Sequence, residues 1–199
     1  MKKSMSGFTI VELLIVIVVI GTLATIGLVS YSAMTKRART AQTATAGTQW
    51  VKTLQLYKIR NGQFPDFPGC LGTGYRYNSD DRGTSGVGQC YQNSSTIGVT
   101  SATVGPTSKT LSEVLQPYAT SQPTPGFVTA ASSSVTWKRG IYYYNDTSTP
   151  KNAMLDVVLD GQISVASCPK LAEKTAASIT QASGNTVCTY NLGLVVGYE

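Results

Sequence analysis

An unbroken apolar segment lies near the N-terminus of the chain. Residues 8–29 contain no Lys, Arg, Asp or Pro, and Glu12 is the only charged side chain among them. About 20 apolar residues in a helix span the roughly 30 Å hydrocarbon core of a bilayer. A secretory signal would have a shorter apolar region followed by a small residue, whereas here the small residue, Gly7, precedes it. The pattern therefore predicts a membrane-spanning helix.

The pattern changes to an amphipathic helical stripe in the next segment. Residues 30–60 contain no proline, and the residues of one helix face recur every three or four positions: Gly47, Trp50, Val51, Leu54 and Tyr57. We expect one helix from about residue 8 to about residue 59, on the order of 75 Å long. Asn61-Gly62 ends it, and Pro65 and Pro68 prevent it from resuming.

The remainder of the chain predicts short strands. A long irregular stretch at residues 64–109 precedes a capping-box pattern, Thr110 with Glu113, that opens a short helix. Strand-forming runs follow at residues 135–145, 153–159, 162–166 and 187–196. Asp160-Gly161 predicts a two-residue hairpin between the second and third of these runs. One very long helix followed by an antiparallel sheet is an α+β fold.

The composition argues against an enzyme. None of the 199 residues is histidine, which removes the commonest general base and the commonest metal ligand. We therefore expect no catalytic residue, no cofactor and no metal. Asn78, Asp80 and Asp81 offer oxygen ligands for calcium, but their spacing matches no EF-hand, and we expect solvated turn residues there.

The net charge of +6 has one local concentration of basic residues, Lys36, Arg37 and Arg39. This cluster adjoins the apolar segment, where basic residues meet lipid headgroups or a neighbouring subunit, or remain solvated on a helix face. Basic stripes interleaved with aromatic residues would indicate nucleic-acid binding. The scattered distribution here predicts no specific nucleic-acid partner.

Four cysteines stand at positions 70, 90, 168 and 188. In an exported chain, an even count without histidine favours disulfides over a zinc site. Three connectivities are possible, and the sequence does not choose among them. The simplest closes two short loops, Cys70 with Cys90 and Cys168 with Cys188.

The first 31 residues resemble a known family. The stretch GFTIVEL at residues 7–13, behind a short basic leader, is similar to the class III signal of type IV pilins and pseudopilins. Gly21 and Tyr31 stand where that family commonly has Gly and Tyr. Residues 61–65, NGQFP, resemble the turn that often follows the long helix in pseudopilins and simpler pilins. The resemblance implies a pilin-like fold, in which the rear half of the long helix packs on an antiparallel β-sheet head.

The resemblance also implies how the chain is divided and processed. Residues 1–7 would be a leader, which a prepilin peptidase removes by cutting between Gly7 and Phe8. The new terminus at Phe8 would then be N-methylated. Residues 8–31 would form the membrane and filament-core helix, residues 32–60 its amphipathic continuation, and residues 61–199 a globular head with disulfide-tied loops.

The function implied by the resemblance is that of a structural subunit of a type IV pilus-like filament. Its partners would be copies of itself in a helical homopolymer, the prepilin peptidase, an inner-membrane platform protein, an assembly ATPase and, before assembly, membrane lipid. The chain would be a single-pass inner-membrane protein first and part of an extracellular pilus on the cell surface afterwards. A pseudopilin of a type II secretion or DNA-uptake system is the alternative. A membrane protein of another class would keep residues 1–7.

Glu12 predicts how such subunits align. Cleavage before Phe8 creates an ammonium group about 6 Å from Glu12 along the helix axis. A carboxylate in hydrocarbon is costly unless it has a partner. If Glu12 of one chain meets the Phe8 amine of the next, a misaligned helix leaves both charges unpaired, so the acid sets the register of assembly. The alternative is a glutamate that reaches the lipid headgroups.

The long helix has two glycines that predict local flexibility. Many pilins carry proline where this chain has Val29. Gly21 and Gly27, separated by β-branched residues, still lower the helix propensity. We hypothesise that any segment that melts or extends in a filament lies between these two glycines.

Overall fold

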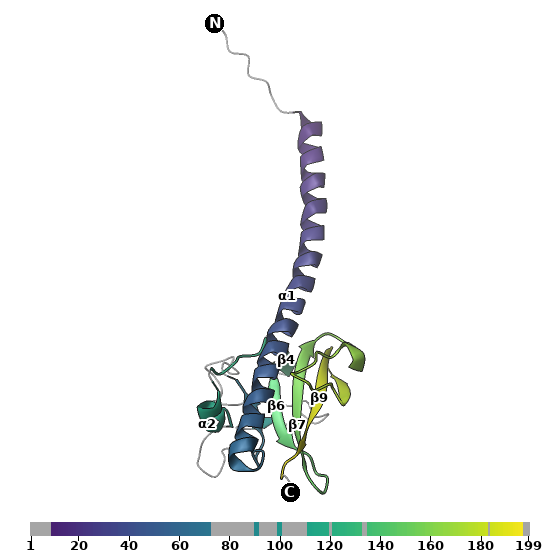
Figure 1. Ribbon diagram of the computed structural model, residues 1–199. Helices are drawn as coiled ribbons and strands as arrows, with labels where there is room; N and C mark the ends of the chain where they lie inside the picture. The colour runs from purple at the N-terminus through teal and green to yellow at the C-terminus, as the bar shows by residue number, and fades with distance from the viewer. Residues whose placement is uncertain are drawn as a thin grey trace. The chain divides into compact units, whose positions relative to one another are not determined.

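A computed structural model describes residues 9–72, 90–91, 99–100, 111–119, 121–132, 135–182 and 184–196. The chain divides into two compact units, Met1–Arg37 and Ala38–Glu199. Helix α1, Ile10–Asn61, runs through the boundary as 52 continuous residues (Figure 1). We call its residues 10–37 the front segment and its residues 38–61 the rear segment. The second unit, which contains the rear segment, is called the globular unit.

The end of α1 agrees with the expected stop signal. Gly62 adopts a φ of 77°, which glycine tolerates because it has no Cβ. Its N–H donates to the carbonyl of Lys58 at 2.8 Å, and the side-chain amide of Asn61 donates to the carbonyl of Tyr57 at 2.8 Å. The carbonyls of Tyr57 and Lys58 in the last turn are therefore satisfied locally.

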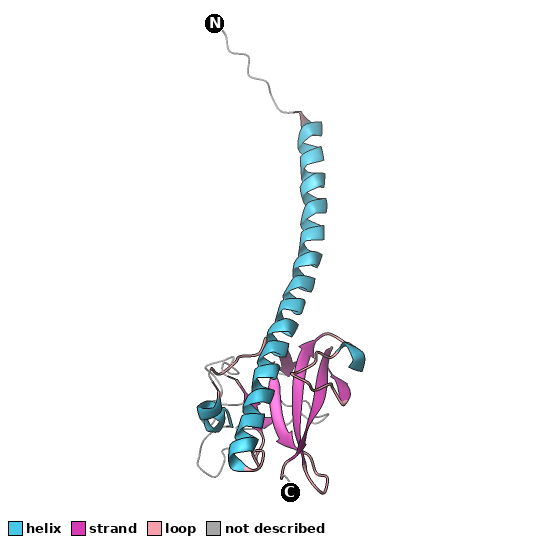
Figure 2. Ribbon diagram, in the orientation of Figure 1, coloured by secondary structure: helices cyan, strands magenta, loops and turns pink. Residues whose placement is uncertain are grey.

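The globular unit is built on a five-stranded antiparallel sheet (Figure 2). The strand order is β1-β6-β7-β9-β8, with bounds β1 Gly69–Leu71, β6 Ile141–Asn145, β7 Asn152–Asp160, β8 Ser178–Ala182 and β9 Asn185–Leu194. Two small pairs join β2, Cys90–Tyr91, to β3, Val99–Thr100, and β4, Val128–Ser132, to β5, Val135–Arg139. The short helical elements are α2, Leu111–Leu115, followed directly by η1, Gln116–Tyr118, and η2, Val165–Ser167. The expected α+β, pilin-like fold is confirmed.

The rear segment of α1 packs on one face of this sheet. Trp50, Val51 and Leu54 are fully buried in one core cluster with sheet residues such as Tyr143 and Tyr190. The expected apolar stripe of the helix is the surface that meets the sheet. Alternation along β6 and β7 places every second side chain on that face.

Two strand predictions were wrong. The run at residues 135–145 is broken at Gly140, so that β5 pairs with β4 while β6 belongs to the main sheet. Residues 162–166 do not pair with β7 across Asp160-Gly161, and the chain instead forms η2. The hydroxyl of Thr186 donates to the carbonyl of Gly161 at 2.8 Å and accepts the N–H of Ile163 at 2.9 Å. This side chain satisfies the backbone groups that a hairpin ladder would have used.

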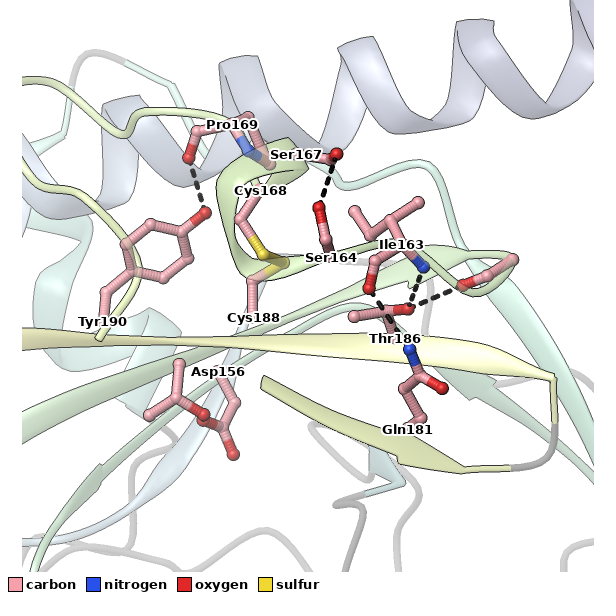
Figure 3. The surroundings of a disulfide bond; sticks show 12 residues. Asp156, Ile163, Ser164, Ser167, Cys168, Pro169, Gln181, Thr186, Cys188 and Tyr190 are labelled. Atoms are coloured by element: carbon pink, nitrogen blue, oxygen red, sulfur yellow. Dashed lines mark hydrogen bonds between the residues drawn. A yellow bond between two sulfur atoms is a disulfide. The ribbon is translucent and has the colours of Figure 1, made fainter. Parts of the chain in front are cut away.

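A disulfide joins the loop after η2 to the sheet. Cys168 is bonded to fully buried Cys188 of β9 (Figure 3). This pair closes the second of the two short loops considered from the sequence. Cys70 is also disulfide-bonded, and its pairing lies outside the described side chains.

Several sequence expectations fall outside or at the edge of the described residues. Asn78, Asp80, Asp81 and Thr110 lie outside them. The calcium alternative and the capping box at residue 110 therefore stay predictions. The short helix expected after residue 110 is present as α2. Within the stretch expected to be irregular, Gly69–Leu71 forms an edge strand of the main sheet.

Candidate functional site

The front segment of α1 presents apolar side chains on all sides. Every large apolar residue from Ile10 to Ile20 keeps between 45% and 84% of its surface exposed. Leu23, Tyr31 and Met34 are exposed by 64% to 73%. A helix that is apolar all round is stable only when something covers it. Among the residues that the structure describes, none covers this surface.

The helix begins with a reciprocal capping box that sequence reasoning missed. The backbone N–H and the hydroxyl of Thr9 donate to Oε2 of Glu12 at 2.8 and 2.7 Å, and the N–H of Glu12 donates to Oγ1 of Thr9 at 3.3 Å. The signal was present in the sequence as Thr-x-x-Glu directly before an apolar run. Glu12 therefore has a local role as a cap in addition to any role in assembly.

Threonine hydroxyls within the front segment are satisfied by the helix itself. Thr22 donates to the carbonyl of Val19 at 2.9 Å, and Thr25 donates to the carbonyl of Thr22 at 2.8 Å. These bonds keep the hydroxyls from competing for other partners. The helix is continuous through Gly21 and Gly27 in the single chain. The hypothesis of a flexible segment between these glycines concerns the filament and stays a prediction.

A family model described as the prokaryotic N-terminal methylation motif matches residues 2–28. The chain carries a type IV pilin-like methylation motif. This motif supports a protein of the type IV pilin or pseudopilin type, and it implies processing by a prepilin peptidase and handling by pilus assembly machinery in general. Searches of curated proteins and of solved structures returned no match.

The methylation motif begins before the described residues and extends into α1. Gly7 and Phe8, the predicted cleavage and methylation residues, lie outside the described residues, whereas Glu12 and Gly21 lie on α1. Among the residues that the structure describes, no helix meets the length and hydropathy needed to cross a membrane. The same residues contain no group of His, Cys, Asp and Glu that could hold a metal ion.

The rear segment is joined to the loop before β4 by side-chain hydrogen bonds and by one close approach of the two backbones. Buried Thr43 accepts the N–H of Gly126 at 2.9 Å, and its hydroxyl lies 3.0 Å from the carbonyl of Gly126. A Cβ added at Gly126 would clash with the backbone carbonyl of Arg39, so only glycine fits at this crossing. Further along, the indole N–H of Trp50 donates to the carbonyl of Pro123 at 2.9 Å.

The opposite face of the sheet holds a buried carboxyl group. Asp156 of β7 is 9% exposed and lies on the side of β9 away from the disulfide (Figure 3). Burial raises the pKa of Asp156 to about 6, although the hydroxyl of Thr189, which donates to Oδ1 at 2.7 Å, acts in the opposite direction. Burial likewise raises the pKa of neighbouring Tyr144 to about 12. The raised pKa of Asp156 makes the stability of the globular unit depend on pH.

Proposed function

We propose that this chain is a structural subunit of a type IV pilus-like filament that polymerises through the front segment of α1. The observation that carries the proposal is the apolar surface from Ile10 to Leu23, which is exposed on every side and lies within residues 2–28, the part of the chain that matches the methylation motif. Packing such helices against one another removes this surface from water, and this burial drives assembly. The protein acts as a building block and as a substrate of its processing machinery, with no catalytic role.

Processing prepares the front segment for assembly in this proposal. A prepilin peptidase removes residues 1–7 by cutting between Gly7 and Phe8, and the new N-terminus is methylated. Before assembly the precursor is a single-pass protein of the inner membrane, and after assembly it is part of a pilus on the cell surface. The near absence of charge from residue 8 to residue 29 supports the membrane stage.

Glu12 sets the register of neighbouring chains in this proposal. Its carboxylate meets the amine of Phe8 from the next subunit, because an unpaired charge among apolar helices is costly. The capping box with Thr9 supplies a rival explanation, in which Glu12 acts only by starting the helix. The two explanations separate experimentally because glutamine is also a good residue at that position of a capping box.

Three variants of the full chain, expressed with the peptidase and assembly machinery, test the proposal. Glu12→Ala removes both charge and cap, Glu12→Gln removes the charge alone, and Thr9→Val weakens the cap while keeping the charge. We expect filaments in electron micrographs from Thr9→Val, and a loss of filaments from both Glu12 variants. Abundant filaments from Glu12→Gln would reject the charge-based register.

Mass spectrometry of the mature N-terminus tests the processing step directly. We expect a methylated Phe8 as the first residue, in wild type and in all three variants. An intact Met1 would reject both the processing and the filament role.

A pseudopilin of a type II secretion or DNA-uptake system is the second candidate. The turn after α1 is compatible with it, because residues 61–65 resemble a turn of both pseudopilins and simpler pilins, and Phe64 in that turn is buried to 1% exposure. Filament length separates the two candidates. Long surface fibres from this chain alone support a pilus, and short fibres that require several minor subunits support a pseudopilin.

A further inference from the structure

A groove with a cavity volume of about 150 Å³ lies on one flank of the rear segment. Lys52 and Leu56 of α1 line one side, and Tyr118 and Ser121 line the other. Leu56 keeps 48% of its surface exposed, and the lining is mostly apolar. Tyr118 is held in place because its ring packs edge-on against that of Tyr57 at 5.1 Å between centroids. The groove is therefore a preformed feature of the globular unit.

The charged side chains of α1 after Glu12 are all basic, and one of them, Lys52, lines the groove. Residues 13–61 contain no Asp or Glu and six basic residues, Lys36, Arg37, Arg39, Lys52, Lys58 and Arg60. Some of these have partners within the chain: Arg39 pairs with Asp160 at 3.7 Å, and Lys58 donates to the carbonyl of Leu194 at 2.9 Å. Lys52 at the groove is exposed and makes no ion pair or hydrogen bond among the described residues. An acidic group placed in the groove would therefore pair with Lys52.

A tight turn with an exposed carboxylate lies on the opposite flank of the same segment. Leu171 and Lys174 exchange two backbone hydrogen bonds of 3.0 and 2.9 Å, which leaves exposed Glu173 at the tip. Leu171 packs at Gly47 of α1, whereas the groove is lined by Gln49. These two helix positions are about 200° apart around the axis. Figure 1 shows the same division, with α2 on one side of α1 and β9 on the other.

We propose that the groove receives the Leu171–Lys174 turn of a second copy of this chain, with Glu173 of that copy meeting Lys52. The proposal rests on the proposed filament function. Identical subunits in a helical polymer meet through two different surfaces, and a groove and a turn on opposite flanks of one segment provide such a pair. Lys170 and Lys174 beside Glu173 would repel Lys52 in any shifted alignment, so the contact also selects the register of the globular units.

Zero-length carbodiimide coupling, which joins an amine directly to a carboxylate, tests the contact on wild-type filaments. Mass spectrometry of the treated filaments should identify a peptide in which Lys52 is joined to Glu173. Detergent-dispersed subunits at the same concentration should lack it. Wild-type filaments in which other pairs couple and Lys52–Glu173 does not would overturn the proposal.

Charge reversal in the full chain gives an independent measurement. Lys52→Glu and Glu173→Lys should each lower filament yield about tenfold, because like charges then face one another across the contact. The double variant should recover most of the yield. Lys151→Glu, the same change at an exposed lysine away from the groove, serves as the matched control and should leave the yield unchanged. Immunoblots of membrane fractions establish that the subunit levels are equal.

The outcomes distinguish this contact from the proposed function. If wild-type chains form no filament, the proposed function and this contact both fail. If filaments form and Lys52→Glu behaves like Lys151→Glu, the contact alone is rejected. If Lys52→Glu leaves filaments intact but weakens binding to phosphatidylglycerol vesicles, the groove serves an anionic lipid surface and the proposal is again overturned.

Discussion

The two segments of α1 belong to one continuous helix but bury their apolar side chains in different ways. The front segment exposes its apolar residues on every side, with Ile17 at 60% exposure. The rear segment confines them to a stripe, and Trp50 in that stripe is fully buried. The rear segment therefore derives its stability from packing on the sheet of the globular unit, whereas the apolar side chains of the front segment are left uncovered by the described residues.

Helix formation and helix function are therefore separable along this chain. Thr9 and Glu12 start the helix by local bonds, and Gly62 ends it locally. Neither end depends on what covers the surface in between. Substitutions in the two segments should therefore affect different measurements, and four predictions test that separation in order of decreasing effect.

The largest expected effect is the loss of Trp50. Trp50→Ala leaves a cavity in the core and removes the donor to the carbonyl of Pro123, so the free energy of unfolding should fall by about 3–5 kcal/mol. Ile17→Ala in the front segment should change it by less than about 0.5 kcal/mol and reduce filament yield instead. Chemical denaturation of the full chain in detergent, followed by circular dichroism, measures both. Equal destabilisation by the two variants would contradict the difference between the two segments.

The second prediction concerns the disulfide. Cys168 and Cys188 are 20 residues apart, so replacing both by serine should lower the free energy of unfolding of the globular unit by about 3 kcal/mol. The helical content of the front segment should not change, because its bonds are local. Denaturation curves report the first effect, and hydrogen exchange of residues 10–25 reports the second. Faster exchange in the front segment would contradict the separation.

The third prediction is a pH dependence confined to the globular unit. The pKa of Asp156 is raised to about 6 by burial, above its ordinary value of 3.8, so the folded state holds this proton more tightly than the unfolded state. This contribution to stability is complete below pH 3.8 and is lost as the pH rises through 6, by about 3 kcal/mol at most.

Asp156→Asn removes that titrating group and keeps an acceptor for Thr189. The variant should therefore be more stable than wild type at pH 7, and its unfolding free energy should vary less between pH 4 and pH 7. Urea denaturation at several pH values measures the difference. Parallel pH profiles for the two proteins would show that Asp156 is not the group responsible.

The smallest expected effects come from a matched pair of glycines. Gly126→Ala forces a methyl group against the Arg39 carbonyl and should cost about 2 kcal/mol. Gly21→Ala meets nothing within 4 Å and should stabilise the front segment by about 0.5–1 kcal/mol, because alanine is the better helix former. Thermal unfolding measures the first and hydrogen exchange the second. We expect stability changes of opposite sign for the two substitutions, and changes of equal sign would contradict the difference between the two segments.

Local patterns in the sequence determined the long helix and most of its chemistry. The apolar run, the stripe containing Trp50 and the Asn61-Gly62 stop depend on neighbours within a few residues, so α1 agrees with its predicted bounds to within two residues at each end. The strands β7 and β9 were predicted for the same reason. The capping box of Thr9 and Glu12 was not predicted, although its Thr-x-x-Glu pattern is also local and could have been recognised in the sequence.

Contacts between distant residues decided the rest of the globular unit. The hydroxyl of Thr186 takes the backbone groups around Gly161, so the hairpin expected there does not form and β8 becomes the partner of β9. Residues 135–145 are divided between two sheets at Gly140 because β5 pairs with β4. The local sequence pattern did not predict strand β4. The groove at Tyr118 and the turn at Glu173 likewise arise only when segments far apart in sequence pack on α1. Backbone groups are satisfied by whichever partner the tertiary structure brings near, and periodicity alone does not identify that partner.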